Sequence, residues 1–479
     1  MRLRRNIFYN VFYQISVIII PLITAPYISR VVGKEGVGVY SYSTSVASYF
    51  ALFILLGVGN YGARSIARNR DDKLLCSRKF WGIYFLQLIC SAVVMTAYVG
   101  FIILTKQKYH TALLIQILYL LSVVLDINWY FIGTEQFRIT VTRGMIIKFV
   151  QVIAIFTFVK SDADVYKYII IMTGGVLLGQ ILLFPVLLKK VCFVRVNTRE
   201  ILSHLKPNLI LFIPILATSV FTIMDKIMLE LINHDIAAVG IYEYSEKIVK
   251  LPLGVITAIG TVMLSKISNL LVNNKESQSN TYFQMSMKYI GIIVVAMAFG
   301  IAGIAPIFSV VFYGQDFSEC GSIITMLAII LMTSSWANII RTQYLIPHEK
   351  DKIYITAVVS GAIVNLGLNY LFIPKFGATG AAIGTIGAEL VLCFVHTVAV
   401  WKKLNLKVYL KDWILYACCG IAMFFGVRLV EIKMGISILT LIIQVLCGVI
   451  IYILLMSIIL LIKQDEIFLK FKRRLSGKP

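Results

Sequence analysis

Long apolar segments follow one another along the whole of this 479-residue chain, and they restrict its fold more than any other feature. Runs of about 20 apolar residues, the length a helix needs to cross a bilayer, recur throughout. Hydrophobic residues make up 59% of the chain and its mean hydropathy is +0.87. A water-soluble domain does not reach such a hydropathy. The sequence therefore predicts an all-α integral membrane protein with several spans.

We expect fourteen transmembrane helices, whose ends follow the ends of the apolar runs. They cover residues 9–29, 39–60, 79–105, 111–133, 145–160, 166–188, 208–232, 236–264, 287–313, 321–345, 353–373, 379–401, 413–430 and 436–462. Gly33, Gly36 and Gly38 predict an outer turn between the first two. Lys and Arg concentrate in alternate connectors, so the positive-inside rule places both termini in the cytoplasm. No predicted connector is long enough for a separate catalytic domain.

Short motifs occur twice along the chain. Gly38-Val-Tyr-Ser-Tyr-Ser43 is matched by Gly240-Ile-Tyr-Glu-Tyr-Ser245, and residues 130–142 align without gaps with residues 344–356. The order of the copies predicts two pseudo-symmetric six-helix lobes plus two C-terminal helices. Because six is even, the lobes insert in the same orientation and are related by an axis along the membrane normal. We predict an N-lobe at 1–190, a C-lobe at 191–401, and two further helices with a basic cytoplasmic tail at 402–479.

Charge and chemistry-bearing residues exclude several classes of function. The net charge of +22 would suggest nucleic acid in a soluble protein, but here the charges lie in connectors, where they meet lipid head groups. We therefore expect membrane lipids and no nucleic acid as partners. The eight cysteines form no Cys-x-x-Cys motif, and the five histidines are isolated, so no metal site is predicted. The Asp162-Ala-Asp164 motif lies on a predicted outer loop, away from any nucleotide sugar. We expect no enzyme.

Three segments carry a family resemblance, namely Pro26–Gly38, Gln343–Pro347 and Asn365–Ala382. With the whole-chain pattern, they resemble the polysaccharide-transport branch of the multidrug/oligosaccharidyl-lipid/polysaccharide exporter superfamily. The resemblance implies a monomeric alternating-access flippase, multi-pass in the bacterial inner membrane. Its cargo would be undecaprenyl-diphosphate-linked oligosaccharide repeat units, turned from the cytoplasmic to the outer leaflet for O-antigen, capsule or exopolysaccharide biosynthesis. The polysaccharide polymerase and the export machinery would be further partners.

Two related functions remain as alternatives. A lipid II flippase, which moves the peptidoglycan precursor, would share the fourteen helices, but its first-lobe arginines are matched here only in part, by Arg30 and Arg64. A cation-coupled multidrug antiporter of the same superfamily typically has twelve helices and few cavity cations.

Polar residues on the predicted helices are the candidate site residues, because a diphosphate and sugar hydroxyls cannot cross hydrocarbon unshielded. The substrate-binding candidates are Arg30, Lys226, Lys247, Lys250, Arg341, Asn338, Gln343, Asn365 and Asn369. Internal ion pairing, snorkelling and hydrogen bonding between helices are the competing interpretations. The candidates for ion coupling or charge pairing are Asp126, Asp225, Glu243 and Glu246, and Asp126 could instead be a fixed partner of Arg30 or Arg138. We expect no cofactor, and coupling to a sodium or proton gradient or to the membrane potential.

Overall fold

The computed structural model describes residues 2–105 and 108–465, with the backbone alone for residues 2–19. This part of the chain is helical and contains no strand, so the predicted all-α class is confirmed. It has 13 helical segments that are long and apolar enough to cross a membrane. The first of them, Ile20–Asn69, is 50 residues long and overlaps both the first and the second predicted helix. The segment count therefore differs from the predicted fourteen where these two helices run together.

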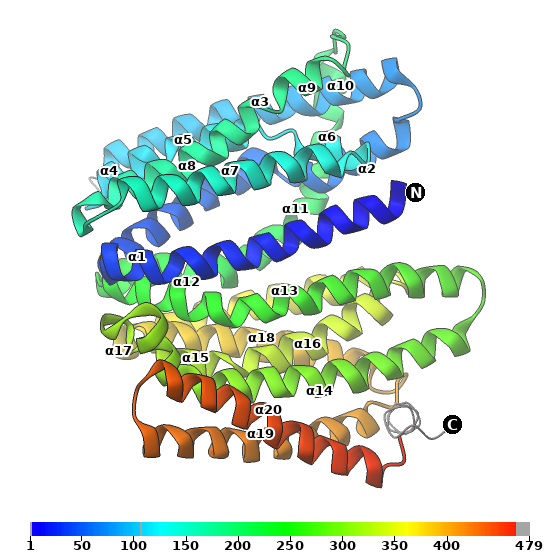
Figure 1. Cartoon of the computed structure of the whole chain (residues 1–479). Coiled ribbons are helices and arrows are strands. Elements are labelled where there is room, and N and C mark those ends of the chain that lie inside the picture. The colour runs from blue at the N-terminus through cyan, green and yellow to red at the C-terminus, as the bar shows by residue number, and fades with distance from the viewer. Residues whose placement is uncertain (1, 106–107, 466–479) are drawn as a thin grey trace. The chain divides into compact units, whose positions relative to one another are not determined.

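The chain divides into two compact units, Met1–Glu243 with Asn369–Ala381 as unit 1, and Tyr244–Leu368 with Ala382–Pro479 as unit 2 (Figure 1). Unit 1 contains α1 (Arg2–Leu55), α2 (Val58–Asn69), α3 (Lys73–Thr105), α4 (His110–Ile115), α5 (Ile117–Val124), α6 (Asn128–Gly133), α7 (Phe137–Phe158), η1 (Asp162–Asp164), α8 (Val165–Ile181), α9 (Phe184–Leu188), α10 (Thr198–Ser203), α11 (Leu205–Ser219), η2 (Val220–Met224) and α12 (Asp225–Asn233). Unit 2 contains α14 (Glu276–Phe308), η3 (Ser309–Tyr313), η4 (Gln315–Phe317), α15 (Cys320–Leu327), α16 (Ile329–Ile340), η5 (Arg341–Leu345), α19 (Leu406–Met434) and α20 (Ile438–Ile462). Three helices contribute to both units: α13 (Ile236–Val272), α17 (Asp351–Phe376) and α18 (Ala378–Val400).

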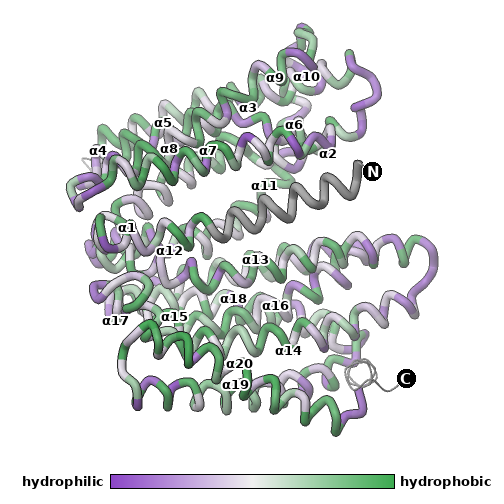
Figure 2. The backbone as a smooth tube through the Cα atoms, viewed as in Figure 1, coloured by the Kyte–Doolittle hydropathy of each residue, from purple (hydrophilic) through white to green (hydrophobic). Residues whose placement is uncertain are grey.

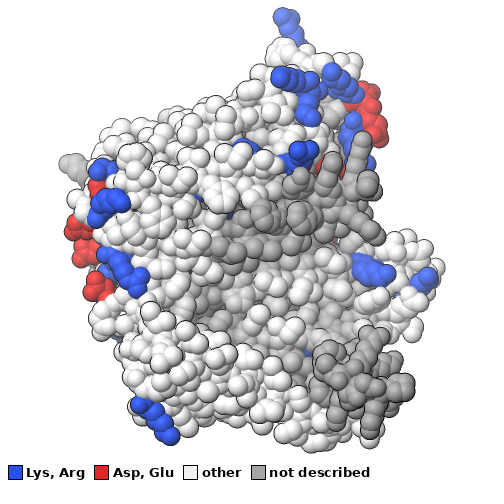
Figure 3. Space-filling view, in the orientation of Figure 1, with Lys and Arg blue, Asp and Glu red and all other residues white. Residues whose placement is uncertain are grey.

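Hydropathy follows the helices closely. In Figure 2 most helices are green along their length, and purple residues gather near the connectors. Figure 3 shows the same division on one face, where Lys, Arg, Asp and Glu lie mainly near the helix ends and the surface along the helices is almost free of them. Many large apolar side chains of the described residues are exposed, which suits a helix face in contact with lipid rather than with water.

Glycines serve two different purposes where α1 crosses α13 in unit 1. Gly33 is the non-helical position inside α1, and its φ of 71° is one that side chains with a Cβ rarely adopt. Gly38 remains helical, as does Gly240 on α13. A Cβ at Gly38 would overlap the carbonyl oxygen of Ile236, and a Cβ at Gly240 would overlap that of Lys34. The two copies of the Gly-x-Tyr-x-Tyr-Ser motif thus begin where two backbones touch, and Gly33 alone supplies the turn that we predicted from three glycines.

The second duplicated motif forms the same helix corner in both units. Glu135 and Glu349, which occupy equivalent positions in the two copies, have φ values of 56° and 55°. The next amide in each, that of Gln136 or Lys350, donates to a carbonyl five residues earlier, at 2.8 and 2.9 Å. This hydrogen-bond pattern is a Schellman end, which closes a helix through one left-handed residue. The sequence repeat is therefore also a repeat of backbone geometry.

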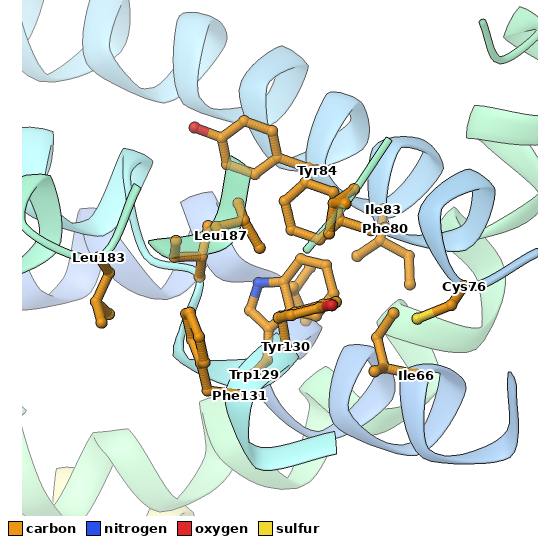
Figure 4. Close-up of a cluster of buried hydrophobic side chains, with 13 residues drawn as sticks. Ile66, Cys76, Phe80, Ile83, Tyr84, Trp129, Tyr130, Phe131, Leu183 and Leu187 are labelled. Atoms are coloured by element: carbon orange, nitrogen blue, oxygen red, sulfur yellow. The ribbon is translucent and has the colours of Figure 1, made fainter. Parts of the chain in front are cut away.

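An aromatic cluster in unit 1 supports the first of these corners (Figure 4). The rings of Phe80 and Trp129 stack with their centroids 5.2 Å apart, and Tyr130 meets Phe80 edge-on at 5.6 Å. The indole nitrogen of Trp129 donates to the backbone oxygen of Asp126 at 3.1 Å. Such aromatic packing stabilises the fold beyond its buried area. It also fixes the interruption between α5 and α6, where Asp126 lies.

Candidate functional site

Asp225 is a buried carboxylate at the start of α12 in unit 1, with only 1% of its surface exposed. The Tyr242 hydroxyl donates to its Oδ2 at 2.8 Å, and the Asn369 amide donates to its Oδ1 at 2.6 Å. The π-helical turn η2 ends directly before it, and such turns recur at functional sites in helical proteins. The structure therefore brings together two predicted site residues, Asp225 and Asn369, that are far apart in the sequence.

Lys226 and Glu243 form an ion pair in the same unit. The Lys226 ammonium lies 2.5 Å from Glu243 Oε2, and the Ser41 hydroxyl donates to the same oxygen at 3.0 Å. Both charged side chains are mostly buried, with 12% and 22% of their surfaces exposed. Ser41 and Glu243 hold equivalent positions in the two copies of the Gly-x-Tyr-x-Tyr-Ser motif. Their contact therefore lies where the copies meet and where their residue types differ.

Asp126 belongs to a polar network at the interruption between α5 and α6. Its Oδ1 accepts hydrogen bonds from the backbone and side-chain amides of Asn128 at 2.8 and 2.7 Å. The Arg143 guanidinium donates to the Asn128 side-chain oxygen at 3.0 Å and to Gln180 at 3.3 Å. Gln87 donates to carbonyls of the interruption, among them that of Asp126 at 3.1 Å. The sequence indicated Asp126 but not the other members of this network.

Among the residues that the structure describes, Asp126 pairs with neither Arg30 nor Arg138. Asn128, two residues along the chain, supplies the hydrogen bonds because the helix interruption turns its amides toward the carboxylate. Arg30 is exposed on α1, and its guanidinium donates to the backbone oxygen of Pro26 at 2.9 Å.

Lys247 and Lys250 share one face of α13 in unit 2, as their spacing predicted. The Lys250 ammonium lies 2.5 Å from Glu246 Oε1 and its side chain is 46% exposed, whereas that of Glu246 is 7% exposed. The Lys247 ammonium lies 5.6 Å from the centre of the Tyr244 ring, within cation–π range. The lysines therefore have partners, yet the Lys250 head remains accessible.

Arg341 is the first residue of the π-helical turn η5, in a membrane-length segment, Cys320–Leu345, that holds no other charged residue. Its guanidinium lies 5.3 Å from the centre of the Tyr354 ring and contacts the Tyr354 hydroxyl at 3.5 Å. Among the residues that the structure describes, no carboxylate forms an ion pair with it. An arginine in an apolar helix without a carboxylate partner is costly, and such residues usually have a functional role.

Glu389 on α18 is a site residue that the sequence analysis missed. Its Oε2 accepts a hydrogen bond from Ser334 at 2.5 Å, and Lys250 and Arg341 lie close enough to act on its charge. The sequence did hold a signal, because Glu389 is the only acidic residue in the predicted span 379–401. Unit 2 thus gathers two cations, Lys250 and Arg341, and two carboxylates, Glu246 and Glu389, from α13, η5 and α18.

The predicted amide residues differ in their surroundings. Gln343 is 2% exposed, and neither atom of its amide has a hydrogen-bond partner among the described residues. Asn338 is half-buried, with its side-chain oxygen against the backbone of Gly260. Asn365 is fully buried. Buried amide groups without partners are unfavourable, so Gln343 is the amide that most needs an additional partner.

The side chains gathered here can bind anions and hydrogen-bonding groups. Within residues 2–105 and 108–465, no group of three or more His, Cys, Asp or Glu side chains could hold a metal ion. Cations at membrane depth with accessible heads attract phosphate, and an arginine can hold it through two parallel hydrogen bonds.

Comparisons with known proteins agree with this architecture. A family model described as "Polysaccharide biosynthesis protein" matches residues 3–270, more than half of the chain. A candidate O-antigen transporter of Shigella dysenteriae is 23% identical over 390 residues, which cover 79% of this chain and 95% of that protein. A candidate O-antigen transporter of Escherichia coli strain K12 is 21% identical over 405 residues, which cover 83% and 97%.

Solved transporter structures share the fold. The inward closed conformation of the lipid II flippase MurJ superposes with a TM-score of 0.75 at 16% identity, covering 95% of this chain and 98% of that chain. An inward-facing multidrug resistance MATE family transporter of the MOP superfamily gives a TM-score of 0.57 at 13% identity, covering 82% and 99%. At these identities the likeness concerns the fold alone.

Proposed function

Because this chain belongs to the polysaccharide biosynthesis protein family, we propose that it is a flippase for lipid-linked oligosaccharides. It moves undecaprenyl-diphosphate-linked repeat units from the cytoplasmic to the outer leaflet of the bacterial inner membrane by alternating access. The product serves O-antigen, capsule or exopolysaccharide biosynthesis, with the polymerase and export machinery as later partners. The names of its two curated relatives support this class of cargo.

The proposal rests on the groups that surround the Arg341 guanidinium. The guanidinium contacts an aromatic ring and a hydroxyl, and among the described residues no carboxylate forms an ion pair with it, although Glu389 acts on it from a longer range. A diphosphate would supply a direct anionic partner and accept two parallel hydrogen bonds from the planar guanidinium. A neutral sugar or an apolar drug would leave the guanidinium without a direct ion pair. Arg341 therefore favours a cargo that carries an anion into the membrane.

The neighbouring charges suit a cargo that must bind and then leave. Lys250 keeps an accessible head while it pairs with Glu246, so a diphosphate can reach it from one side. Glu389 lies near both cations and competes with the diphosphate for them. A binding group that is partly satisfied by internal carboxylates holds an anion less tightly. The oligosaccharide hydroxyls would find hydrogen-bond partners in amides such as that of Gln343.

We propose that a sodium or proton gradient or the membrane potential drives the cycle. The carboxylates available for this are Asp126, Asp225, Glu243 and Glu246. Glu243 and Glu246 are each paired with a lysine, so protonation of either would release a cation. Three separate treatments distinguish the driving forces by which of them stops transport: replacement of external sodium by choline, collapse of the pH difference by nigericin with potassium, and collapse of the membrane potential by valinomycin with potassium.

The central experiment measures cargo movement by the purified protein in liposomes. Undecaprenyl-diphosphate-linked repeat units are loaded, and their appearance in the opposite leaflet is followed by cleavage with an added glycosidase. Arg341→Gln should lower the initial rate by about tenfold or more, because a charge-assisted hydrogen bond to an anion is lost. Arg341→Lys keeps the charge but not the planar fork, and should retain part of the rate.

Controls separate loss of the site from loss of the protein. Arg199→Gln removes the charge of an exposed arginine on α10 and should leave the rate unchanged. Lipid II in the same liposomes tests the nearest alternative cargo. Movement of lipid II but of no lipid-linked oligosaccharide would overturn the proposal, as would full activity of Arg341→Gln.

A further inference from the structure

A groove runs along unit 1 between α7 and the α8–α9 segment, which lie side by side (Figure 1). It has a volume of about 510 Å³. Two arginines of α7, Arg138 and Arg143, line one part of it. Apart from Thr142, apolar side chains line the rest, among them Ile146 of α7 and Leu182 and Val186 of the facing segment. A cationic end and an apolar body are thus combined in one cavity.

The interruption between α8 and α9 makes room for this groove. α8 ends at Ile181 and α9 begins at Phe184, so Leu182 and Leu183 lie between two helices. Pro185, at the start of α9, has no backbone N–H and cannot continue the hydrogen-bond ladder of α8. Leu182 is left 56% exposed beside the groove.

The two arginines differ in how firmly they are held. The Arg143 guanidinium is anchored by two neutral oxygens, those of Asn128 at 3.0 Å and Gln180 at 3.3 Å. Arg138 is exposed and makes no hydrogen bond or ion pair with the residues that the structure describes. One guanidinium is therefore preorganised and the other is available, an arrangement that can close on a phosphate from two sides.

The groove opens toward lipid rather than toward water. Ile146, Phe149, Val150 and Ile153 form one stripe along α7 at helical spacing, and each is more than half exposed, from 53% to 66%. Arg138 precedes Ile146 on this stripe by two turns. An exposed, wholly apolar helix face is stable only against hydrocarbon. Arg138 thus lies where such a face ends, at the depth of lipid head groups.

Basic residues near the start of α7 indicate which side of the membrane this end of unit 1 faces. A polar pocket joins the ends of α2, α6 and α9 to the start of α3, and its lining includes Arg70, Lys73 and Lys190. Arg70 also pairs with Glu135 at 2.6 Å, next to the start of α7. The excess of Lys and Arg favours the cytoplasmic side. The groove then faces the cytoplasmic leaflet.

We propose that this groove binds an anionic phospholipid of the cytoplasmic leaflet. Its phosphate lies between Arg138 and Arg143, and an acyl chain fills the apolar part beside Ile146 and Leu182. Basic pockets between transmembrane helices on the cytoplasmic side are suited to such head groups. Beyond the arginines, Thr142 is the one polar side chain among the lining residues, too little to hold an oligosaccharide, so a membrane lipid fits better than the cargo. The site is independent of the cargo that the flippase carries.

Native mass spectrometry of the purified full chain tests the proposal, with phosphatidylglycerol as the probe and phosphatidylcholine as the zwitterionic reference. The wild type should retain phosphatidylglycerol preferentially. Arg138→Gln with Arg143→Gln should weaken its binding by about tenfold or more, because two charge-assisted contacts are lost. Arg195→Gln with Arg199→Gln removes the same charge from exposed residues of the same unit and should leave binding unchanged.

Two further variants test the groove without changing Arg143, whose replacement could disturb the α5–α6 interruption. Arg138→Gln alone removes the exposed guanidinium and should still weaken binding. Ile146→Trp fills the groove with both charges intact and should reduce lipid retention. Equal retention of phosphatidylglycerol by the wild type and the double variant would overturn the proposal, as would an equal loss in the control. Undecaprenyl diphosphate serves as a third probe. If the double variant loses binding of this probe alone, the groove belongs to the cargo instead.

Discussion

Glu389 offers the sharpest test at the scale of a single residue. Its carboxylate accepts from Ser334 and acts on Lys250 and Arg341. Glu389→Gln keeps the size and the hydrogen-bonding capacity but removes the charge that competes with a diphosphate. We expect KM for the lipid-linked cargo to fall by about threefold to tenfold, since one charge at this range is worth about 1 kcal/mol in a partly wet site. Turnover should fall as well, because release becomes slower.

The control for this prediction is Glu276→Gln at the exposed start of α14, which should change neither constant. An unchanged or raised KM in Glu389→Gln, with normal insertion in the membrane, would remove Glu389 from the binding group.

The residues that sequence reasoning found and missed differ in a physical way. Arg341, Asp225 and Asn369 stand out because a polar side chain in an apolar run is costly wherever it points. Arg143 was not predicted as a site residue because it lies close to a predicted helix start, where basic residues are common. Its partner Asn128 could not be inferred, since the contact depends on an interruption between α5 and α6 that hydropathy does not reveal.

At the scale of elements, the crossing of α1 and α13 depends on the absence of two side chains. A Cβ at Gly240 would overlap the backbone oxygen of Lys34, which cannot move without shifting α1. Gly240→Ala should therefore destabilise unit 1 by about 1–3 kcal/mol, the usual cost of overpacking. Loss of the monodisperse peak after graded heating, followed by size-exclusion chromatography in detergent, measures this shift.

Gly254→Ala is the matched control, because it lies on the same helix and a Cβ there meets nothing within 4 Å. It should be neutral or stabilising by about 0.5–1 kcal/mol, as expected for removing glycine from a helix interior. Equal heat resistance of Gly240→Ala and the wild type would show that the two backbones are not in contact.

Helix existence was predicted better than helix extent, and the reason lies in what hydropathy measures. α14 begins at Glu276 and α13 ends at Val272, both well beyond the apolar runs, because polar residues continue a helix outside the hydrocarbon. The π-helical turns at η2 and η5 also left no trace in the apolar pattern. By contrast, the corner at Glu135 and Glu349 lies within the gapless sequence match, so the repeat that the sequence shows is also found in the backbone.

At the scale of the whole molecule, duplication of the backbone is combined with unequal charge. When the second motif is aligned without gaps and extended backward, Asp126 corresponds to Ile340 and Ile127 corresponds to Arg341. Helix geometry is interrupted at this place in both copies, by the α5–α6 break in one and by η5 in the other. One copy therefore places an acid there and the other a base. The predicted lobe limits near residues 190 and 401 stay predictions, because the compact units divide inside α13, α17 and α18.

Membrane orientation is the remaining whole-molecule prediction, and a native cysteine tests it. Cys192 is exposed in the connector between α9 and α10, which the Lys and Arg excess assigns to the cytoplasm. In a variant whose other cysteines are serine, a membrane-impermeant maleimide should label Cys192 in inverted vesicles but not in intact cells. Ile436→Cys, in the exposed connector between α19 and α20, should show the opposite pattern in a chain that also carries Cys192→Ser. Labelling of Cys192 from outside intact cells would show that the predicted orientation is reversed. The groove beside α7 would then face the outer leaflet.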